Sequence, residues 1–545
     1  MSEMNIPTGK NQAAARDAGS APDPRRWLIL GVIGLAQLMV VLDVTIVNIA
    51  LPSAQRSLGF STVDRQWVVT AYALAFGSLL LLGGRLADLF GRKVTFLTGL
   101  IGFAAASAVG GAATTFGMLV AARACQGMFG ALLAPSALSL LTTTFTDNKE
   151  RGKAFGVFGA IAGAGGAVGL LLGGVLTEYL SWRWCLYVNL FFAAIAAAGA
   201  SVLLRRQPSR DRPRLDLPGV LTVSGGMFCI VYGFSNAALH SWHAPSTWGF
   251  LAAGVVLLVL FGFRQARAPQ PLLPPRVVTD RNRGGAYLTM LIASAGVFGI
   301  FLFLTYYLQQ TLGFSPVVTG LAFLPMVAGI MTASITSNIV LMPRFGPRPL
   351  APTGMILAAG GLALLTRIGV HSSYAAAVLP SLLMMGLGLG LVFAPVFNTG
   401  TFGVPPQDTG VAAATVNTGQ QLGGSIGTSL LNTIFASAVA SYIASHITPG
   451  ALLHGRPGPQ LIGLALVHGY TTAFWWSAAI FASGAVICGT LLRRGPLTQA
   501  AVPQGAAAAA PSAQASAESP AVRPGTRAGG QDGGRTAGQP PGVHF

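Results

Sequence analysis

The chain has 545 residues, 52% of them hydrophobic and only 9% charged, with a net charge of +18 and a mean hydropathy of +0.63. Soluble domains carry about 25% charged residues, so this composition excludes an ordinary soluble protein and predicts one embedded in a membrane. A nucleic-acid partner is not expected, because the basic residues are spread over separate loops. The four cysteines lie in different apolar segments without CxxC spacing, which argues against a disulfide framework and against a metal site.

Fourteen apolar runs are long enough to cross a bilayer as helices, a crossing that needs about 18 or more residues. The first run is too long for the core of a signal peptide and lacks a small-residue cleavage site, so we expect it to be retained as a helix. The longest run exceeds one crossing and is expected to extend beyond the bilayer. The expected spans are residues 27–51, 67–87, 94–113, 117–142, 154–179, 184–204, 218–238, 247–264, 285–308, 317–341, 350–368, 375–397, 410–443 and 468–492.

The distribution of Lys and Arg predicts the orientation of the chain. If the N-terminus is cytoplasmic, 27 of the 33 basic residues fall on the cytoplasmic side, and Arg123 lies within a span. Cytoplasmic loops carry an excess of basic residues, so we expect both termini in the cytoplasm and a multi-pass protein in the cell (plasma or inner) membrane. Anionic lipid headgroups are the expected partners of these loops. The remaining basic residues, expected in outer loops, are Arg56, Arg65, Arg183, Arg367 and Arg456.

Asp43 and Arg123 are the only charged residues well inside these apolar runs. A charge at the bilayer centre costs about 2.5–3.5 kcal/mol on insertion scales, so such residues are normally kept for a function. Asp43 lies roughly 12 Å and Arg123 roughly 9 Å from the outer end of its span, at 1.5 Å per residue. The two can therefore pair if their helices are neighbours. A proton-exchange site is favoured because Asp43 is the only carboxylate deep in any span, and a structural salt bridge is the alternative.

The loop after the second span reads GGRLADLFGRK, from Gly83 to Lys93. Its glycines permit close helix approach or positive φ, and its basic pair suits the cytoplasmic face. The segment resembles the loop signature of the major facilitator superfamily, with Leu89 at a position that is often Arg. The resemblance implies a gate in which Asp88 and Arg92 close the inner side in one state. The residues that it assigns to gating are Gly84, Asp88, Gly91, Arg92 and Lys93.

Two further motifs narrow this resemblance. The first span ends LDVTIVNIALP, which is similar to the first-helix motif of the fourteen-span drug–proton antiporter branch typified by EmrB and QacA. The fourth span carries R-x-x-Q-G, which resembles the buried-arginine motif that the superfamily associates with proton transfer. The resemblance covers about residues 27–494. It implies proton coupling by Asp43 and Arg123, with Thr45, Asn48 and Gln126 beside them in the substrate cavity.

The fifth span, GVFGAIAGAGGAVGLLLGG, resembles the glycine-rich antiporter motif, with Leu170 where that motif has proline. Small residues let membrane helices approach closely, so these glycines are expected to seal an ion-leak path against a neighbouring span. A nucleotide-binding loop is rejected, because the glycines lie in an apolar helix with no preceding strand. The glycines assigned to gating are Gly165, Gly169, Gly173 and Gly174.

In the second half of the chain, the thirteenth span carries the polar segment NTGQQLGGSIG, from Asn417 to Gly427. Asn417, Gln420 and Gln421 are candidates to line the cavity, and hydrogen bonding between helices is an equally good interpretation. His240 and His243 have imperfect ligand spacing, so no metal site is expected. No set of nucleophile, base and acid suggests an enzyme, and no cofactor is expected.

The resemblance implies an all-α polytopic membrane protein with the major facilitator fold, in which a cavity between two six-helix bundles opens to alternate sides. We expect disordered termini at 1–26 and 495–545, bundles at 27–204 and 268–494, and two inserted helices within 205–267. The expected function is proton-coupled export of hydrophobic or cationic small molecules by a monomer. The alternatives are a dedicated exporter of one endogenous metabolite or antibiotic, and a membrane sensor that transports nothing.

Overall fold

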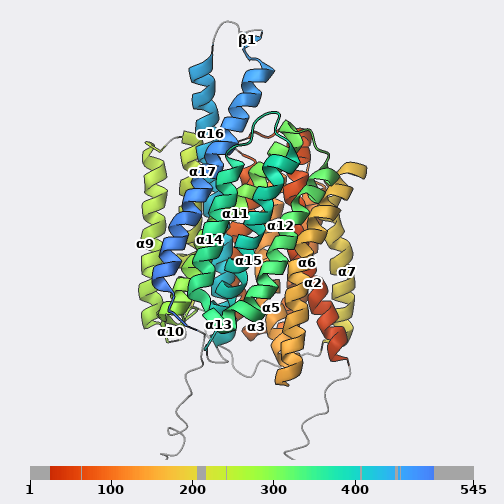
Figure 1. The fold of residues 1–545 in the computed structure, drawn as a ribbon. Helices are drawn as coiled ribbons and strands as arrows, with labels where there is room; N and C mark the ends of the chain where they lie inside the picture. The colour runs from red at the N-terminus through yellow and green to blue at the C-terminus, as the bar shows by residue number, and fades with distance from the viewer. Residues whose placement is uncertain are drawn as a thin grey trace, which may run out of the picture. The chain divides into compact units, whose positions relative to one another are not determined.

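The computed structural model describes residues 25–62, 64–145, 147–204, 216–240, 242–269, 271–404, 408–447, 452–453 and 456–495. Nearly all of this part of the chain is helical (Figure 1). The helices are α2 Arg26–Leu58, α3 Gln66–Phe90, α4 Arg92–Gly111, α5 Phe116–Thr144, α6 Asn148–Tyr179, α7 Trp184–Leu203, α8 Leu217–His240, α9 Pro245–Arg267, α10 Pro275–Val278, α11 Arg281–Tyr306, α12 Pro316–Thr336, α13 Met342–Phe345, α14 Pro347–Leu365, α15 Leu379–Thr401, α16 Thr409–His446 and α17 Pro459–Leu491, with π-helical turns η1 Tyr307–Thr311, η2 Ser337–Leu341 and η3 Tyr374–Val378. Most of the two expected tails, residues 1–24 and 496–545, lies outside the described residues, whereas Arg26, expected in the first tail, begins α2.

Thirteen of the described helical stretches are long and apolar enough to cross a membrane. The expected fifth span belongs to α6, whose described apolar stretch, Ala164–Tyr179, is shorter. The prediction of an all-α membrane protein is therefore confirmed, with α6 as the fourteenth helix in the set. Helix ends differ from the predicted ones where the chain stays helical past the apolar run. For example, α2 continues through Pro52 to Leu58 and ends at Gly59, whose φ of 68° favours glycine.

The helices pack in two groups of neighbours. Helices α2 to α7 contact one another chiefly through the pairs α3–α5, α4–α5 and α2–α6, and helices α11 to α17 through α11–α16, α14–α15 and α12–α15. We call these groups the first and second bundle. They meet where α3 lies along α16 and where α6 lies along α12. Helices α8 and α9 pack on each other, and α8 also contacts α3 and α16. The predicted domain boundaries stay a prediction.

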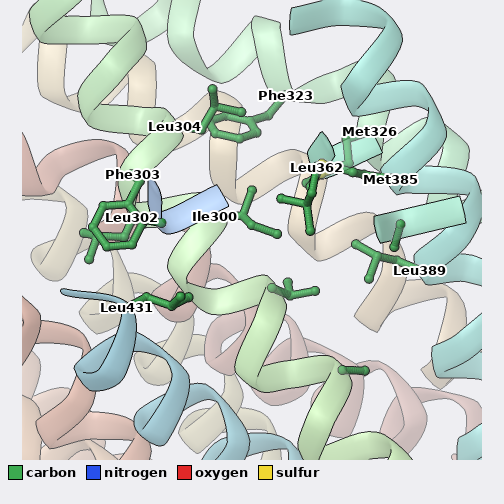
Figure 2. Packing of buried hydrophobic residues seen from close by; sticks show 14 of the residues in the cluster. Ile300, Leu302, Phe303, Leu304, Phe323, Met326, Leu362, Met385, Leu389 and Leu431 are labelled. Atoms are coloured by element: carbon green, nitrogen blue, oxygen red, sulfur yellow. The ribbon is translucent and has the colours of Figure 1, made fainter. Parts of the chain in front are cut away.

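The core of the second bundle is built from apolar side chains of α11, α12, α14 and α15. Figure 2 shows Phe303 and Leu304 of α11 with Phe323 and Met326 of α12 in this layer. Phe303 and Phe323 have no exposed surface. Burying such side chains between helices fixes the positions of the polar groups that the same helices carry.

We call the end of the molecule where α2 begins and α17 ends the termini end, and the opposite end the far end (Figure 1). At the far end α16 and α17 extend past their neighbours. With 38 residues, α16 is about 57 Å long, well over the roughly 30 Å hydrocarbon thickness of a bilayer. The expectation that the longest apolar run extends beyond one crossing is met by α16. Beyond it, β1 Leu452–Leu453 pairs antiparallel with β2 Arg456–Pro457.

Candidate functional site

The two charges that the sequence placed at similar depth form a buried ion pair. Arg123 Nη1 of α5 lies 2.5 Å from Asp43 Oδ2 of α2. Asp43 has no exposed surface and Arg123 is 2% exposed, so the pair is shielded from both solvent and lipid. The expected juxtaposition is therefore present, and the exchange of a proton at this pair is taken up below as a proposal.

Two neutral amides complete the shell around the carboxylate. Gln126 Nε2 donates to Asp43 Oδ1 at 2.9 Å, and Asn189 Nδ2 donates to the same oxygen at 2.8 Å. Ser107 of α4 links the amides, because its Oγ accepts from Gln126 at 2.7 Å and from Asn189 at 3.4 Å. Hydrogen bonds to a charged group contribute more than neutral ones. Four helices, α2, α4, α5 and α7, thus converge on one carboxylate.

Arg123 is also held by α3. Its Nε donates to the Val68 carbonyl at 3.1 Å, and its Cζ lies 4.5 Å from the centroid of the Tyr72 ring. The Tyr72 hydroxyl is buried, with no hydrogen-bond partner in the part of the chain that the structure describes. The guanidinium therefore connects Asp43 of α2 to one turn of α3.

A glycine makes this approach sterically feasible. Gly127 follows Gln126 on α5, and a Cβ there would clash with the carbonyl oxygen of Tyr72. Because glycine has no Cβ, α5 can lie directly on the α3 backbone, which brings Arg123 within reach of Val68. The R-x-x-Q-G motif thus supplies the cation, its amide partner and the close approach that both need.

Ser107 and Asn189 escaped the sequence analysis. Each is a polar residue in an apolar run, in AAASAVGG and in WCLYVNLFF, and both are fully buried. A search for every amide or hydroxyl inside a span would have found them, among many others. Only the packing of α4 and α7 on α2 singles these two out.

The other residues expected in the cavity make local contacts. Thr45 Oγ1 donates to the carbonyls of Val41 and Leu42 at 3.0 and 3.1 Å, and Asn48 Nδ2 donates to Val44 at 3.1 Å, all within α2. On α16, Asn417 Nδ2 donates to Ala413 at 3.1 Å, and Gln420 is half-buried. Gln421 Oε1 is buried with no partner among the described residues. Of the six candidates, Gln126 alone contacts the ion pair in this structure.

The loop motif divides into residues with different contacts. Gly91 has a φ of 89°, which allows the abrupt turn from α3 to α4. Lys93 Nζ donates to the carbonyls of Ser201 and Leu204 at 2.7 and 2.5 Å and so caps the end of α7.

The close helix approach in this loop comes from a glycine that was not selected. A Cβ at Gly83 would clash with the Ala131 carbonyl oxygen, whereas one at Gly84 would come only within 3.8 Å of Pro135. Arg92 is half-buried at the start of α4, and the side chain of Asp88 lies outside the described residues. The gate proposed for Asp88 and Arg92 therefore stays a prediction.

The glycines of α6 face two partners. A Cβ at Gly165 would lie 3.1 Å from Val41 of α2, one at Gly173 would lie 2.9 Å from Ile46 of α2, and one at Gly169 would clash with Thr45. A Cβ at Gly174 would lie 2.7 Å from the Pro316 carbonyl oxygen of α12, in the second bundle. These glycines therefore let α6 pack closely on α2 of its own bundle and on α12 of the second bundle.

Leu170, which stands where the related motif has proline, is 1% exposed inside an uninterrupted α6. Its carbonyl oxygen would lie 2.5 Å from a Cβ at Gly320 of α12. Glycines on both α6 and α12 therefore allow the close helix packing that the motif implies, without the proline.

One of the basic residues expected in outer loops is buried, and its side of the membrane stays a prediction. Arg65, expected in an outer loop, is 1% exposed and lies between the bundles at the start of α3. Its Cζ lies 4.2 Å from the ring centroid of Tyr306, a residue of the second bundle. A count of basic residues registers only that Arg65 precedes a span, so it cannot show that packing buries the side chain.

A set of membrane-length helices that holds an ion pair away from both solvent and lipid defines the class of protein, a polytopic α-helical membrane protein. The comparison with protein families makes the assignment specific, because the model of the Major Facilitator Superfamily matches residues 33–428. The chain belongs to the major facilitator superfamily.

The chain is similar to several named relatives. It is 49% identical to the puromycin resistance protein pur8 of Streptomyces alboniger, over 91% of this chain and 96% of the relative. It is 38% identical to the cephamycin export protein CmcT of Amycolatopsis lactamdurans, over 75% and 86% of the two chains. The tetracenomycin C resistance and export protein of Streptomyces glaucescens is 35% identical, over 76% and 77%.

Among solved structures, the fold is similar to that of a bacterial homologue of the human lysosomal transporter Spinster. The TM-score is 0.59 at 15% sequence identity, and the match covers 86% of this chain and 98% of that one. At this identity the likeness concerns the fold alone.

Proposed function

We propose that this protein exports hydrophobic or cationic small molecules of the antibiotic class in exchange for protons, by alternating access. The observation that carries the proposal is the buried Asp43 carboxylate, which accepts from Arg123, Gln126 and Asn189 at 2.5, 2.9 and 2.8 Å. A carboxylate is the one group in this shell that can take up and release a proton. The named relatives, which are resistance and export proteins for puromycin, cephamycin and tetracenomycin C, support an antibiotic cargo.

Protonation of Asp43 would neutralise its carboxylate and so break the ion pair with Arg123. Arg123 would keep the Val68 carbonyl at 3.1 Å and Gln126 Oε1 at 2.8 Å, so the cation stays partly bonded while its counter-charge disappears. A cavity of about 10 Å³, bounded by Arg123, Leu51 and Leu186, lies beside the pair. That volume is about that of one water molecule, but the lining is almost wholly apolar, so we expect the cavity to be dry while the bundles are closed and the proton to arrive when they separate.

The driving force is sufficient for accumulation against a gradient. One charge that crosses 100 mV releases about 2.3 kcal/mol, and one pH unit adds about 1.36 kcal/mol. Their sum corresponds to a cargo gradient of a few hundred-fold per proton, at about 1.4 kcal/mol per factor of ten.

Contacts between the bundles support a closed far end. Tyr306 Oη donates to Gln55 Oε1 at 2.5 Å, and Gln309 Nε2 donates to the Ile49 carbonyl at 3.1 Å. The backbone N–H of Val317 donates to Glu178 at 2.9 Å. Beyond these contacts lies a recess of about 450 Å³ between Arg56 of α2 and Gln309–Pro316 of the second bundle. Separation of these contacts would connect the interior to that recess, which we propose as the exit.

We further propose that both termini are cytoplasmic, so that the far end faces outside. The positive-inside count supports this orientation. The protein acts as a monomer and moves its cargo without altering it chemically. Its partners are the cargo, protons and membrane lipids.

The test uses purified protein in proteoliposomes with an imposed pH gradient. Gradient-driven movement of puromycin, tetracenomycin C and ethidium is measured for the wild type, for Asp43→Asn and for Asp64→Asn. Asp64 is the matched control, because its carboxylate bonds to Ser61 Oγ at 2.7 Å in the far-end loop, away from the ion pair. We expect Asp43→Asn to abolish gradient-driven movement and Asp64→Asn to retain it.

Other outcomes separate the alternatives. Normal gradient-driven export by Asp43→Asn would refute the coupling role. Transport of a single antibiotic among a broad panel would favour the dedicated exporter. Tight binding without movement of any cargo under the gradient would favour the sensor.

A further inference from the structure

Arg65 is a buried cation without a carboxylate. It is 1% exposed, immediately before α3, and it forms no ion pair with any residue that the structure describes. Its Nε and Nη2 form no well-aligned hydrogen bond in the same part of the chain, and the nearest acceptors there are the hydroxyls of Tyr306 and Tyr470. A buried polar group without a partner is costly and unusual in native proteins. Arginine cannot escape the cost by losing its proton. Arg65 therefore requires a functional explanation.

Aromatic rings from the other bundle surround this guanidinium. Its Cζ lies 4.2 Å from the ring centroid of Tyr306, 4.9 Å from that of Phe435 and 5.5 Å from that of Phe303. The Tyr470 ring stacks on Phe435 at 5.1 Å, and its hydroxyl lies close to the Arg65 guanidinium. We call these four rings the aromatic cage. The charge comes from the first bundle and the cage from α11, α16 and α17 of the second, so the contact exists only while the bundles are closed at this end.

Further buried polar atoms without described partners lie on α3 and α16, the two helices that meet between the bundles. On α3 they belong to Gln66 and Thr70, which follow Arg65 directly. On α16 they belong to Gln421, Ser425 and Thr428, spaced four and three residues apart, so that they lie on one face of the helix. The same face reaches Phe435 of the cage after two more turns. Helices α3 and α16 lie side by side, and Thr418 Oγ1 of α16 donates to the Gly77 carbonyl of α3 at 3.3 Å.

The signs of the buried charges indicate what Arg65 and the neighbouring polar groups of α3 and α16 would bind. Asp43 is occupied by Arg123, Gln126 and Asn189, so an ammonium group would find no free carboxylate there. Nε and Nη2 of Arg65 carry three N–H bonds, and the described residues offer them only the weak tyrosine hydroxyls as acceptors. An oxygen that carries negative charge or a strong dipole would satisfy them, and the planar guanidinium is shaped to hold such oxygens in pairs.

We propose that Arg65 and the aromatic cage form a cargo subsite for an anionic or carbonyl oxygen borne on an aromatic molecule. The proposal rests on the export function proposed above, and it adds a recognition element for oxygen acceptors. When the bundles separate at the far end, the cage leaves the guanidinium and the cargo oxygen takes its place. When they close again, the rings return to Arg65 and displace the cargo.

The test measures binding to purified full-length protein in phosphatidylcholine nanodiscs by fluorescence polarisation. The probes are fluorescein, an aromatic anion with carboxylate and conjugated oxygens, and ethidium, an aromatic cation without oxygen. The variants are Arg65→Gln and Arg65→Lys. Arg367→Gln is the matched control, because Arg367 is an exposed arginine just after α14 and lines neither the cavity beside Arg123 nor the exit recess.

We expect Arg65→Gln to lose at least about tenfold in fluorescein affinity alone, and Arg367→Gln to bind both probes as the wild type does. Arg65→Lys keeps the charge without the planar fork and is expected to lose about three- to tenfold. It serves as the test if Arg65→Gln does not elute as folded protein. Unchanged fluorescein binding in the folded Arg65 variants would overturn the proposal, and so would an equal loss of ethidium affinity in Arg65→Gln.

The two proposals fail in different ways. If selective binding depends on Arg65 but proteoliposomes show no gradient-driven movement of either probe, the subsite stands and the export function fails. If the probes move with the gradient and Arg65→Gln changes neither their affinities nor their rates, export stands and the subsite fails.

Discussion

The substitution Asp43→Asn tests whether the buried ion pair serves stability or proton exchange. In the wild type, Oδ2 of Asp43 faces Arg123 at 2.5 Å, and Oδ1 faces Gln126 and Asn189. All three neighbours donate, so an amide in place of the carboxylate must turn its own N–H groups toward a donor. The substitution also leaves the guanidinium charged and buried, at 2% exposure, without its counter-charge.

Removal of one partner from a buried ion pair costs about 3–5 kcal/mol, because the remaining charge is uncompensated. At 1.4 kcal/mol per factor of ten, the unfolding equilibrium should shift by about 10²–10⁴-fold. Glu150→Gln is the control. It removes the Arg26–Glu150 pair at 2.7 Å, whose side chains are 19% and 30% exposed, and it should cost less than about 1 kcal/mol.

Stability would be measured by reversible SDS-induced unfolding in mixed micelles, monitored by near-ultraviolet circular dichroism. The double variant Asp43→Asn/Arg123→Gln removes both charges and should regain most of the lost stability, since neutral replacements of a buried pair are often nearly neutral. Gradient-driven transport should stay absent in the double variant if Asp43 carries the proton. A loss by Asp43→Asn no larger than that of Glu150→Gln would refute the energetic argument. Recovery of transport in the double variant would show that the pair is structural.

Two further substitutions test packing and electrostatics away from the ion pair. Gly174→Leu should reduce transport at least about tenfold at normal expression, because its Cβ would lie 2.7 Å from the Pro316 carbonyl oxygen and the added side chain would hold the bundles apart. Gly166→Leu is the control and should transport normally, since no atom lies within 4 Å of its Cβ. Equal transport by the two variants would contradict this steric argument. At the start of α8, burial favours the protonated form of Asp216, but hydrogen bonds led by that from Arg264 hold its pKa below the ordinary 3.8. Its stabilising contribution should thus be complete above pH 3.8 and be lost as the pH falls below that value. In Arg264→Gln the drop in melting temperature between pH 5 and pH 3 should be smaller, and an unchanged drop would contradict this assignment.

The sequence was sufficient for the pair and for one of its partners. Two charges in apolar runs must be compensated, and the depth count along straight helices put Asp43 and Arg123 at one level. Gln126 lies three residues after Arg123 on the same helix, so its amide falls on the same face. The number and positions of the spans follow from the lengths of the apolar runs, and these lengths do not depend on how the helices pack.

The rest depended on which helices become neighbours. Asn189 and Ser107 join the site only because α7 and α4 pack on α2 and α5, and periodicity carries no information about that. Arg65 lies at the end of an apolar run, where a solvated loop residue and a residue buried between bundles look the same in sequence. Similarly, Gly83 and Gly84 are chemically identical, and only the position of the Ala131 carbonyl distinguishes them.

One turn of α3 connects the two buried guanidinium groups. Arg65 precedes this turn and reaches the aromatic cage, while Val68 and Tyr72 hold Arg123 through a hydrogen bond of 3.1 Å and a ring contact at 4.5 Å. Arg123 in turn is held by Asp43. A proton on that carboxylate would remove the strongest electrostatic attraction that fixes Arg123 against α2, and α3 is the element that Arg123 still contacts through Val68. Because α3 also carries Arg65 against the second bundle, the same helix would bias both the proton site and the closure of the far end. Coupling between two sites requires a shared element whose position both of them affect, and α3 meets that requirement by direct contact.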